Sequence, residues 1–169
     1  LWISPWLRDV AGRTSPGNML AAVAAAMILG FGIAGTLADR IARGGIEHLA
    51  VLKASYAISI AMFALISLGV TTAAPVIWVV YAVCSTAGTT LSYPILSRRF
   101  SAELAGRVIT ASNMLVFVGA FVAQWAIGAV IGLWPVENGH YALAGYQAAF
   151  GLSLVLQFGA FALLLMQRS

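Results

Sequence analysis

Charged residues are scarce in this sequence, and cysteine is almost absent. Only 8% of the 169 residues are Asp, Glu, Lys or Arg, and 62% are hydrophobic, whereas soluble domains are roughly a quarter charged. The single cysteine, Cys84, excludes an internal disulfide framework and a cysteine-based metal site. The sequence also lacks a Ser/His/Asp set, a phosphate-binding loop and an H-E-x-x-H motif. We therefore expect no enzyme activity, no metal and no cofactor.

Long stretches without any charged residue occupy most of the chain. They cover residues 14–38, 54–97, 108–136 and 141–167, and one membrane-spanning helix needs about 20 apolar residues. Residues 54–97 are long enough for two helices, and Pro75 suits the first turn of the second, where no backbone donor is needed. Barrel strands would alternate in polarity, and these runs do not.

The predicted fold class is therefore an all-α integral membrane protein. The five predicted transmembrane helices are about 17–38, 48–70, 75–97, 105–134 and 142–167. Residues 1–13, with Trp2 and Trp6, are interpreted as the end of a sixth helix. Because the chain opens on Leu1 and the number of complete spans is odd, we interpret it as a fragment whose beginning is missing.

The basic residues gather in alternate loops between the predicted helices. One set comprises Arg40, Arg43, Lys53, Arg98, Arg99, Arg107 and Arg168, and the opposite set comprises only Arg8 and Arg13. By the positive-inside rule, residues 39–53, 98–107 and the C-terminus are predicted to be cytoplasmic. We expect a multi-pass protein of a plasma membrane, of the bacterial inner-membrane kind. The lipid bilayer, rather than nucleic acid, is its predicted surrounding.

Two sets of polar residues interrupt the apolar helices. Tyr81, Ser85, Thr89 and Ser92 are spaced by four, four and three residues, which puts them on one helix face. They line a wet pathway, or they bond the carbonyl oxygens of their own helix. Asn113 and Gln124 also share a helix face; they contact a substrate or form interhelical hydrogen bonds. These six residues are the candidates for a substrate cavity.

The segment Gly35-Thr36-Leu37-Ala38-Asp39-Arg40-Ile41-Ala42-Arg43 joins the first two predicted spans. It resembles the cytoplasmic loop of the major facilitator superfamily (MFS), at Gly35, Leu37, Asp39, Arg40 and Arg43. Ala42 stands where the family usually has glycine, and Gly44 where it usually has a second basic residue. Such departures are typical of the copy of this loop in the C-terminal half. Helix order is similar too, from the end of helix seven through helix twelve. The resemblance covers essentially all 169 residues and implies the C-terminal half of a twelve-helix fold.

Residues 98–107 look like the loop that joins helices ten and eleven in this family. Ser101 is expected to cap the next helix, and Glu103 suits its positive end and stands four residues before Arg107. The resemblance implies that Asp39 contacts a helix start in the other half and holds the cytoplasmic side closed. The alternative is a simple pairing of Asp39 with Arg40 or Arg43. The residues of this predicted conformational latch are Gly35, Asp39, Arg40, Arg43, Glu103 and Arg107.

The resemblance also implies a function. An MFS protein is a secondary active transporter, or permease, that moves a small solute by alternating access between two halves. The partner would be the missing N-terminal half, and coupling to a proton is left open. Span 75–97 would line the cavity, spans 17–38 and 105–134 would contact the other half, and spans 48–70 and 142–167 would face lipid. The alternative function is a non-transporting membrane scaffold or receptor with the same fold.

Overall fold

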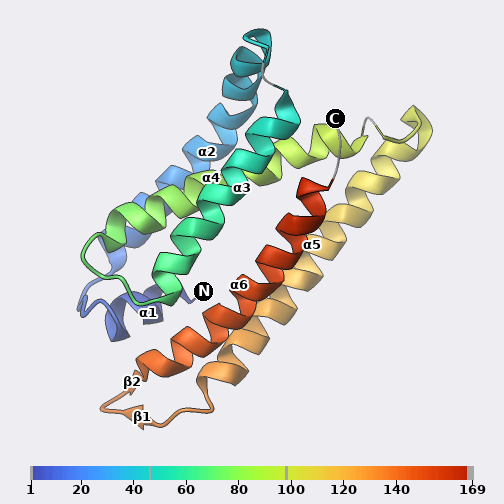
Figure 1. Cartoon of the computed structure of the whole chain (residues 1–169). Coiled ribbons are helices and arrows are strands. Elements are labelled where there is room, and N and C mark those ends of the chain that lie inside the picture. Colours follow the sequence, from blue (N-terminus) through green and yellow to red (C-terminus); the bar gives the residue numbers. More distant parts are fainter. Residues whose placement is uncertain (1, 46, 98, 167–169) are drawn as a thin grey trace.

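Five long helices dominate the computed structural model, which describes residues 2–45, 47–97 and 99–166 (Figure 1). They are α2 (Gly17–Arg43), α3 (His48–Ser67), α4 (Ala74–Ser97), α5 (Ala102–Ile131) and α6 (Leu143–Leu165). All five are long and apolar enough to cross a membrane. The architecture therefore agrees with an all-α membrane protein that crosses the bilayer several times.

The helix ends differ from the predicted ones by a few residues. Helix α2 continues past residue 38 to Arg43, so Asp39 lies on a helix and not in a loop, and the turn follows at Gly45 with a φ of +90°. Helix α3 ends at Ser67 instead of residue 70, and the predicted end at 167 lies outside the described residues, as do Arg98 and Arg168.

The start of α5 also differs from the prediction. This helix begins at Ala102 rather than at residue 105, and it ends at Ile131 rather than at 134. Ser101 occupies the N-cap position, but its side chain makes no capping hydrogen bond, so the predicted side-chain cap is wrong. Glu103 does lie in the first turn, where a carboxylate suits the positive helix end.

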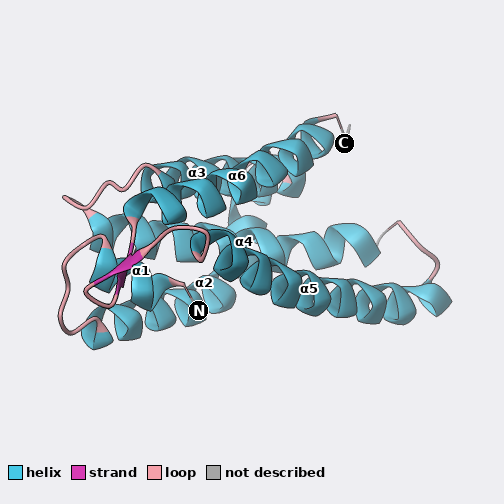
Figure 2. Ribbon diagram, turned by 90° about the horizontal axis from the view of Figure 1, so that it is seen from below, coloured by secondary structure: helices cyan, strands magenta, loops and turns pink. Residues whose placement is uncertain are grey.

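Helix α4 is the central element of the bundle. It packs against both α2 and α3, which contact each other only slightly. Helices α5 and α6 lie antiparallel and join this group mainly through α6 against α3, with a smaller contact between α4 and α5 (Figures 1 and 2). Gly30 on α2 allows a close approach to α4. A Cβ atom there would lie 2.2 Å from Oγ1 of Thr86 on α4, so only glycine fits this crossing.

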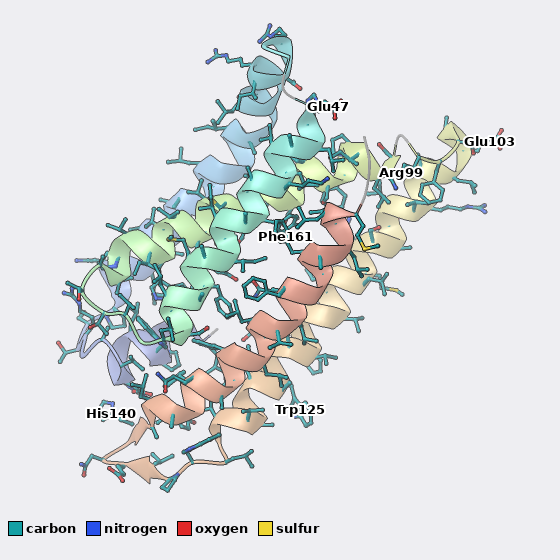
Figure 3. The ribbon with its side chains drawn as sticks, viewed as in Figure 1. Glu47, Arg99, Glu103, Trp125, His140 and Phe161 are labelled. Carbon is teal, nitrogen blue, oxygen red and sulfur yellow. The ribbon has the colours of Figure 1, made fainter. Side chains whose placement is uncertain are left out.

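Two small elements lie at one end of the bundle. Residues Ile3–Asp9 form a short helix, α1, within the segment interpreted as a helix end. The antiparallel hairpin of Val136–Glu137 (β1) with His140–Tyr141 (β2) was not predicted. Asn138 and Gly139 form its turn with φ angles of 50° and 77°, as a two-residue turn of the primed type requires. In Figure 3, His140 marks this end, and Glu47 and Glu103 mark the opposite one.

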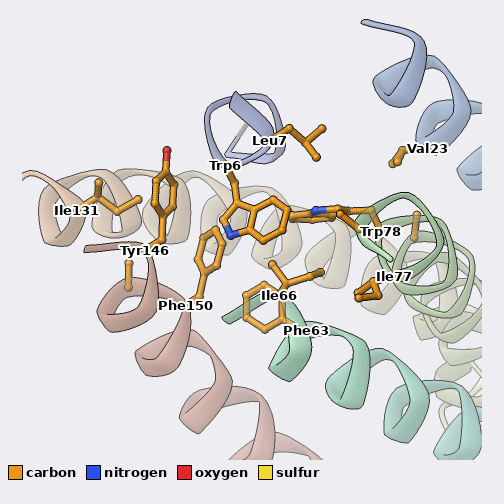
Figure 4. Close-up of a cluster of buried hydrophobic side chains, with 13 residues drawn as sticks. Trp6, Leu7, Val23, Phe63, Ile66, Ile77, Trp78, Ile131, Tyr146 and Phe150 are labelled. Carbon is orange, nitrogen blue, oxygen red and sulfur yellow. The ribbon is translucent and has the colours of Figure 1, made fainter. Parts of the chain in front are cut away.

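The hydrophobic core lies at the hairpin end. Trp6 and Leu7 of α1 are fully buried, and the Trp6 ring packs edge-on against Trp78 of α4 at 5.7 Å between centroids (Figure 4). Phe63 and Phe150 complete the contact from α3 and α6. Toward the other end the buried cluster shrinks to Leu52 and Leu91 with a few partly buried neighbours. There the helices enclose a cavity.

Candidate functional site

A cavity of about 570 Å³ lies between α3, α4 and α6, within the range of roughly 300–1,000 Å³ usual for ligand pockets. We call it the α3–α4–α6 pocket. The described residues that line it are Leu52, Tyr56, Ser59, Ile60, Tyr81, Ser85, Thr89, Ser92, Gln157, Ala160, Phe161, Leu163 and Leu164. None of these lining residues carries a charge. The pocket therefore combines hydroxyl and amide groups with aromatic and aliphatic walls.

The predicted polar face of α4 lines this pocket along its whole length. The Thr89 hydroxyl donates to the backbone carbonyl of Ser85 at 3.0 Å, and the Ser92 hydroxyl donates to that of Thr89 at 2.7 Å. Tyr81, one turn earlier, lines the same pocket. The interpretation that hydroxyls bond their own helix is confirmed for Thr89 and Ser92, and all four residues of this face border the cavity.

Helix α3 supplies pocket residues that the sequence analysis missed. Ser59 is buried, and its hydroxyl lies 2.8 Å from that of Ser85, which joins α3 to α4 at the floor of the pocket. Tyr56 lines the pocket one turn earlier. The available signal was the three-residue spacing of Tyr56 and Ser59 on an otherwise apolar helix.

Helix α6 closes the pocket with Gln157 and Phe161. Figure 3 shows Phe161 on α6 beside α3. Spans 48–70 and 142–167 are expected to face lipid, and α3 and α6 each also turn one side to the pocket. The few polar residues on α6 form no line along the helix, which is typical of a helix surrounded by lipid. The pocket needs only one of them, Gln157, together with apolar neighbours on the same helix.

The other two cavity candidates lie elsewhere. The Tyr93 hydroxyl of α4 donates to Oδ1 of Asn113 on α5, which is the interhelical bond considered as the alternative. The Gln124 backbone carbonyl accepts a hydrogen bond from Nε1 of Trp2 at 3.1 Å, and its side-chain Oε1 is buried without a partner in the described chain. Neither Asn113 nor Gln124 lines the α3–α4–α6 pocket. The structure does not bring all six candidates together.

The predicted latch residues lie at the end of the bundle opposite the hairpin. The His48 ring donates from Nε2 to Oδ1 of Asp39 at 3.0 Å, and this pair borders a small cavity of about 250 Å³ with Gly35 and Thr90. The alternative pairing of Asp39 with its own helix neighbours is therefore wrong, since the observed partner belongs to α3. Asp39 is 70% exposed, so the pair contributes little stability.

The remaining latch residues are exposed to solvent. Arg40 and Arg43 lie in the last turns of α2, and Glu103 and Arg107 lie in the first turns of α5. Among the described residues, Glu103 and Arg107 form no ion pair despite their favourable spacing. In this conformation the two charged helix ends are therefore available to another surface.

A buried carboxylate at the hairpin end was not predicted. Asp9 has no exposed side-chain surface; its Oδ1 accepts from Nε of Arg8 at 2.7 Å and from Nδ1 of His140 at 2.8 Å. Its Oδ2 accepts from the Tyr146 hydroxyl at 2.8 Å and the Tyr141 backbone N–H at 3.2 Å. We call these five residues the Asp9 clasp. Burial alone would raise the pKa of Asp9, but the hydrogen bonds from Arg8, Tyr146 and His140 outweigh it and lower that pKa.

The Asp9 clasp ties α1 to β2 and to the start of α6. No sequence signal revealed it, because Asp9 and its partners in the hairpin are more than 130 residues apart. In the part of the chain that the structure describes, no group of three His, Cys, Asp or Glu side chains is placed to hold a metal ion. The hydrogen bonds of the clasp join α1 to the hairpin and to α6.

Comparison of the chain with protein-family models, with curated proteins and with solved structures gives no match. The family resemblance of residues 35–43 rests on sequence pattern and helix order. Function must therefore be argued from the α3–α4–α6 pocket and from the charged helix ends.

Proposed function

We propose that this chain forms one half of a secondary active transporter of the major facilitator type, which moves a small solute across a plasma membrane. The observation that carries the proposal is the α3–α4–α6 pocket. Polar groups are costly within apolar helices unless they are paired or face water or a ligand. Here seven polar side chains border one cavity of ligand size, which gives a solute a polar site at the depth of the bilayer.

The exposed faces of the bundle support a partner half. Helix α5 is the least buried of the five long helices, and Phe117, Phe121 and Trp125 each expose at least 70% of their surface. Lipid covers such a face as readily as protein does. The proposal assigns α2 and α5 to the second half because the family resemblance does so, with the latch residues at their charged ends.

The orientation proposed for this transporter follows the basic residues. Arg40, Arg43, Arg99 and Arg107 lie at the end of the bundle opposite the hairpin, and an excess of Lys and Arg is typical of cytoplasmic loops. The proposal therefore puts this end and the C-terminus in the cytoplasm. It puts the Asp9 clasp on the outer side.

Blocking the pocket should stop transport. In full-length protein, Ser85→Leu fills the floor of the pocket and removes the hydroxyl partner of Ser59. We expect uptake of the transported solute to fall about tenfold or more, since leucine occupies space in the pocket and removes a hydroxyl partner of the solute, and one unmade hydrogen bond to a bound polar group costs about 1–3 kcal/mol. The measurement is a mass-spectrometric screen of a metabolite library for uptake into membrane vesicles, comparing wild type with the variant.

Two further variants make this screen decisive. Ser153→Leu is the control for the same substitution, because Ser153 donates to the Ala149 carbonyl of its own helix, α6, and does not line the pocket. Thr89→Val keeps the side-chain shape and tests the site if Ser85→Leu does not fold, as judged by size-exclusion chromatography. The proposal is contradicted if wild-type vesicles take up no solute faster than Ser85→Leu and Thr89→Val vesicles do.

The latch hypothesis gives a separate prediction. Asp39→Asn in the full-length protein removes a charge that would bond a helix start in the other half, and such a charged hydrogen bond contributes about 1.5–3 kcal/mol. We expect the transport rate to fall about tenfold while the amount of protein in the membrane is unchanged. Glu47→Gln removes another exposed acid at the same end and should transport normally.

His48→Gln separates the two possible roles of Asp39. If Asp39 acts through the observed bond to His48, the histidine variant should lose the same activity. If Asp39 acts through the other half, His48→Gln should transport at the wild-type rate. Normal transport by Asp39→Asn refutes the latch.

A further inference from the structure

The polar atoms of the α3–α4–α6 pocket are mainly acceptors. Each hydroxyl has one hydrogen to donate and two lone pairs to accept with. The hydroxyls of Thr89 and Ser92 already donate to carbonyl oxygens of α4. Ser59 and Ser85 share one hydrogen bond, so one of their two hydroxyl hydrogens is used between them. The hydroxyls of Tyr56 and Tyr81 each add one hydrogen and two lone pairs. Because every lining hydroxyl contributes two lone pairs and at most one free hydrogen, the acceptor sites still outnumber the donors.

None of the described lining residues carries a charge that could pair with an ion, so we expect the pocket to bind ions weakly. A cation would find acceptors and aromatic rings, but the attraction of a ring for a cation is weaker than the cost of taking an unpaired cation out of water. An anion would meet oxygen lone pairs. Lys53, beside the lining residue Leu52, already donates to the backbone carbonyl of Leu165. The pocket thus suits a neutral molecule.

Gln157 is the amide among the described pocket residues, and it has no hydrogen-bond partner there. It is half-buried on α6, across the cavity from α4, and its amide forms no hydrogen bond within the described chain. An amide offers two donors and one acceptor oxygen, so it can bind a hydroxyl or amide of a ligand from the side opposite Ser59 and Ser85. Leaving such a group unpaired within apolar helices is unfavourable, and a ligand would satisfy it.

The remaining walls are apolar. Leu52, Ile60, Phe161 and Leu164 face the same cavity as the hydroxyls, so a bound molecule would contact both hydrocarbon and polar groups. We infer that the α3–α4–α6 pocket binds an uncharged amphipathic molecule that donates hydrogen bonds through a hydroxyl or amide N–H, and that Gln157 determines this specificity. This inference rests on the proposed function and adds the substrate class.

Four probes with one aromatic skeleton test the inference. They are 2-naphthol, a neutral donor; 2-methoxynaphthalene, which is neutral without a donor; 2-naphthoate, an anion; and 2-naphthylmethylammonium, a cation. Binding to full-length protein in phosphatidylcholine nanodiscs is measured by naphthalene fluorescence, with empty nanodiscs as the blank. We expect 2-naphthol to bind about tenfold more tightly than the methyl ether, because one unmade buried hydrogen bond costs about that factor.

Gln157→Leu should reduce the affinity for 2-naphthol to that of the methyl ether. Gln147→Leu is the matched control, since Gln147 lies on the same helix, bonds the Leu68 backbone carbonyl and does not line the pocket. It should bind 2-naphthol as the wild type does. Tightest binding of the anion or the cation overturns the inference. So does unchanged affinity in Gln157→Leu, or no saturable binding of 2-naphthol.

The two proposals fail differently. One outcome is that Ser85→Leu blocks transport but the pocket prefers an ion. That result refutes the inferred substrate class and still supports the proposal that the protein is a transporter. Selective 2-naphthol binding that depends on Gln157, without uptake of any solute, supports the site and refutes transport.

Discussion

Gly30→Ala is expected to leave little folded protein in the membrane. The new Cβ would lie 2.2 Å from Oγ1 of Thr86, far inside contact distance. Thr86 is buried, and its hydroxyl bonds the carbonyls of Ala82 and Val83 at 2.9 and 3.0 Å, so it cannot turn away without losing them. Overpacking of this kind costs about 1–3 kcal/mol or more. Stability is measured as unfolding of the purified protein by sodium dodecyl sulfate.

Two controls distinguish this clash from a general effect of the substitution. Gly32→Ala lies on the same helix where an added Cβ meets nothing within 4 Å, so its stability should match the wild type. Thr86→Ala removes the clashing oxygen, and the nearest atom is then the Cβ of residue 86 at 3.4 Å, an ordinary contact. The double variant should therefore recover most of the stability. Equal stability of Gly30→Ala and Gly32→Ala would show that α2 and α4 do not approach so closely.

Asp9→Ala should be the second most damaging change. It removes the acceptor for the Tyr146 hydroxyl and the Tyr141 backbone N–H, which are buried or half-buried. Arg8 and His140 are about half exposed and regain water. Each unsatisfied buried donor costs about 1–3 kcal/mol, so we expect a loss of about 3 kcal/mol. Asp39→Ala is the control, because that carboxylate is largely exposed and should cost little.

The pH dependence of stability tests the same residue. The pKa of Asp9 in the folded protein lies below its usual 3.8, so the ionised clasp stabilises the protein fully above that value. Its contribution is lost as the pH falls through the lowered folded pKa. The stability difference between wild type and Asp9→Asn should therefore be constant at neutral pH and shrink below about pH 4. A difference that grows on acidification would contradict the assignment.

The transmembrane pattern was predictable because it depends on local chemistry. Each of the five helices needs only an uncharged run of sufficient length and a charge, proline or glycine near its ends. Even the polar face of α4 could be predicted from the spacing of Tyr81, Ser85 and Thr89, since helix geometry puts these residues on one side. The hairpin had a signal as well, Asn138-Gly139, which favours a two-residue turn.

The partners of these elements could not be predicted from the same local rules. Ser59 and Gln157 join the α4 face only because α3 and α6 pack on either side of it. Asn113 does not line the cavity, and its side chain instead accepts a hydrogen bond from the Tyr93 hydroxyl of α4. Periodicity states which residues share a face, but it does not state which helix that face meets, since lipid and protein are equally apolar neighbours.

By itself, the sequence determined a helical chain suited to a membrane, its helix positions within a few residues, and the polar face of α4. These follow from hydrophobicity and from backbone geometry within single segments. Only the tertiary structure decided that this face lines a pocket together with α3 and α6, and that Asp9 is buried among residues from the far end of the chain. Both depend on close packing between distant segments, which is set by shape and by hydrogen-bond pairing across helices and not by local composition.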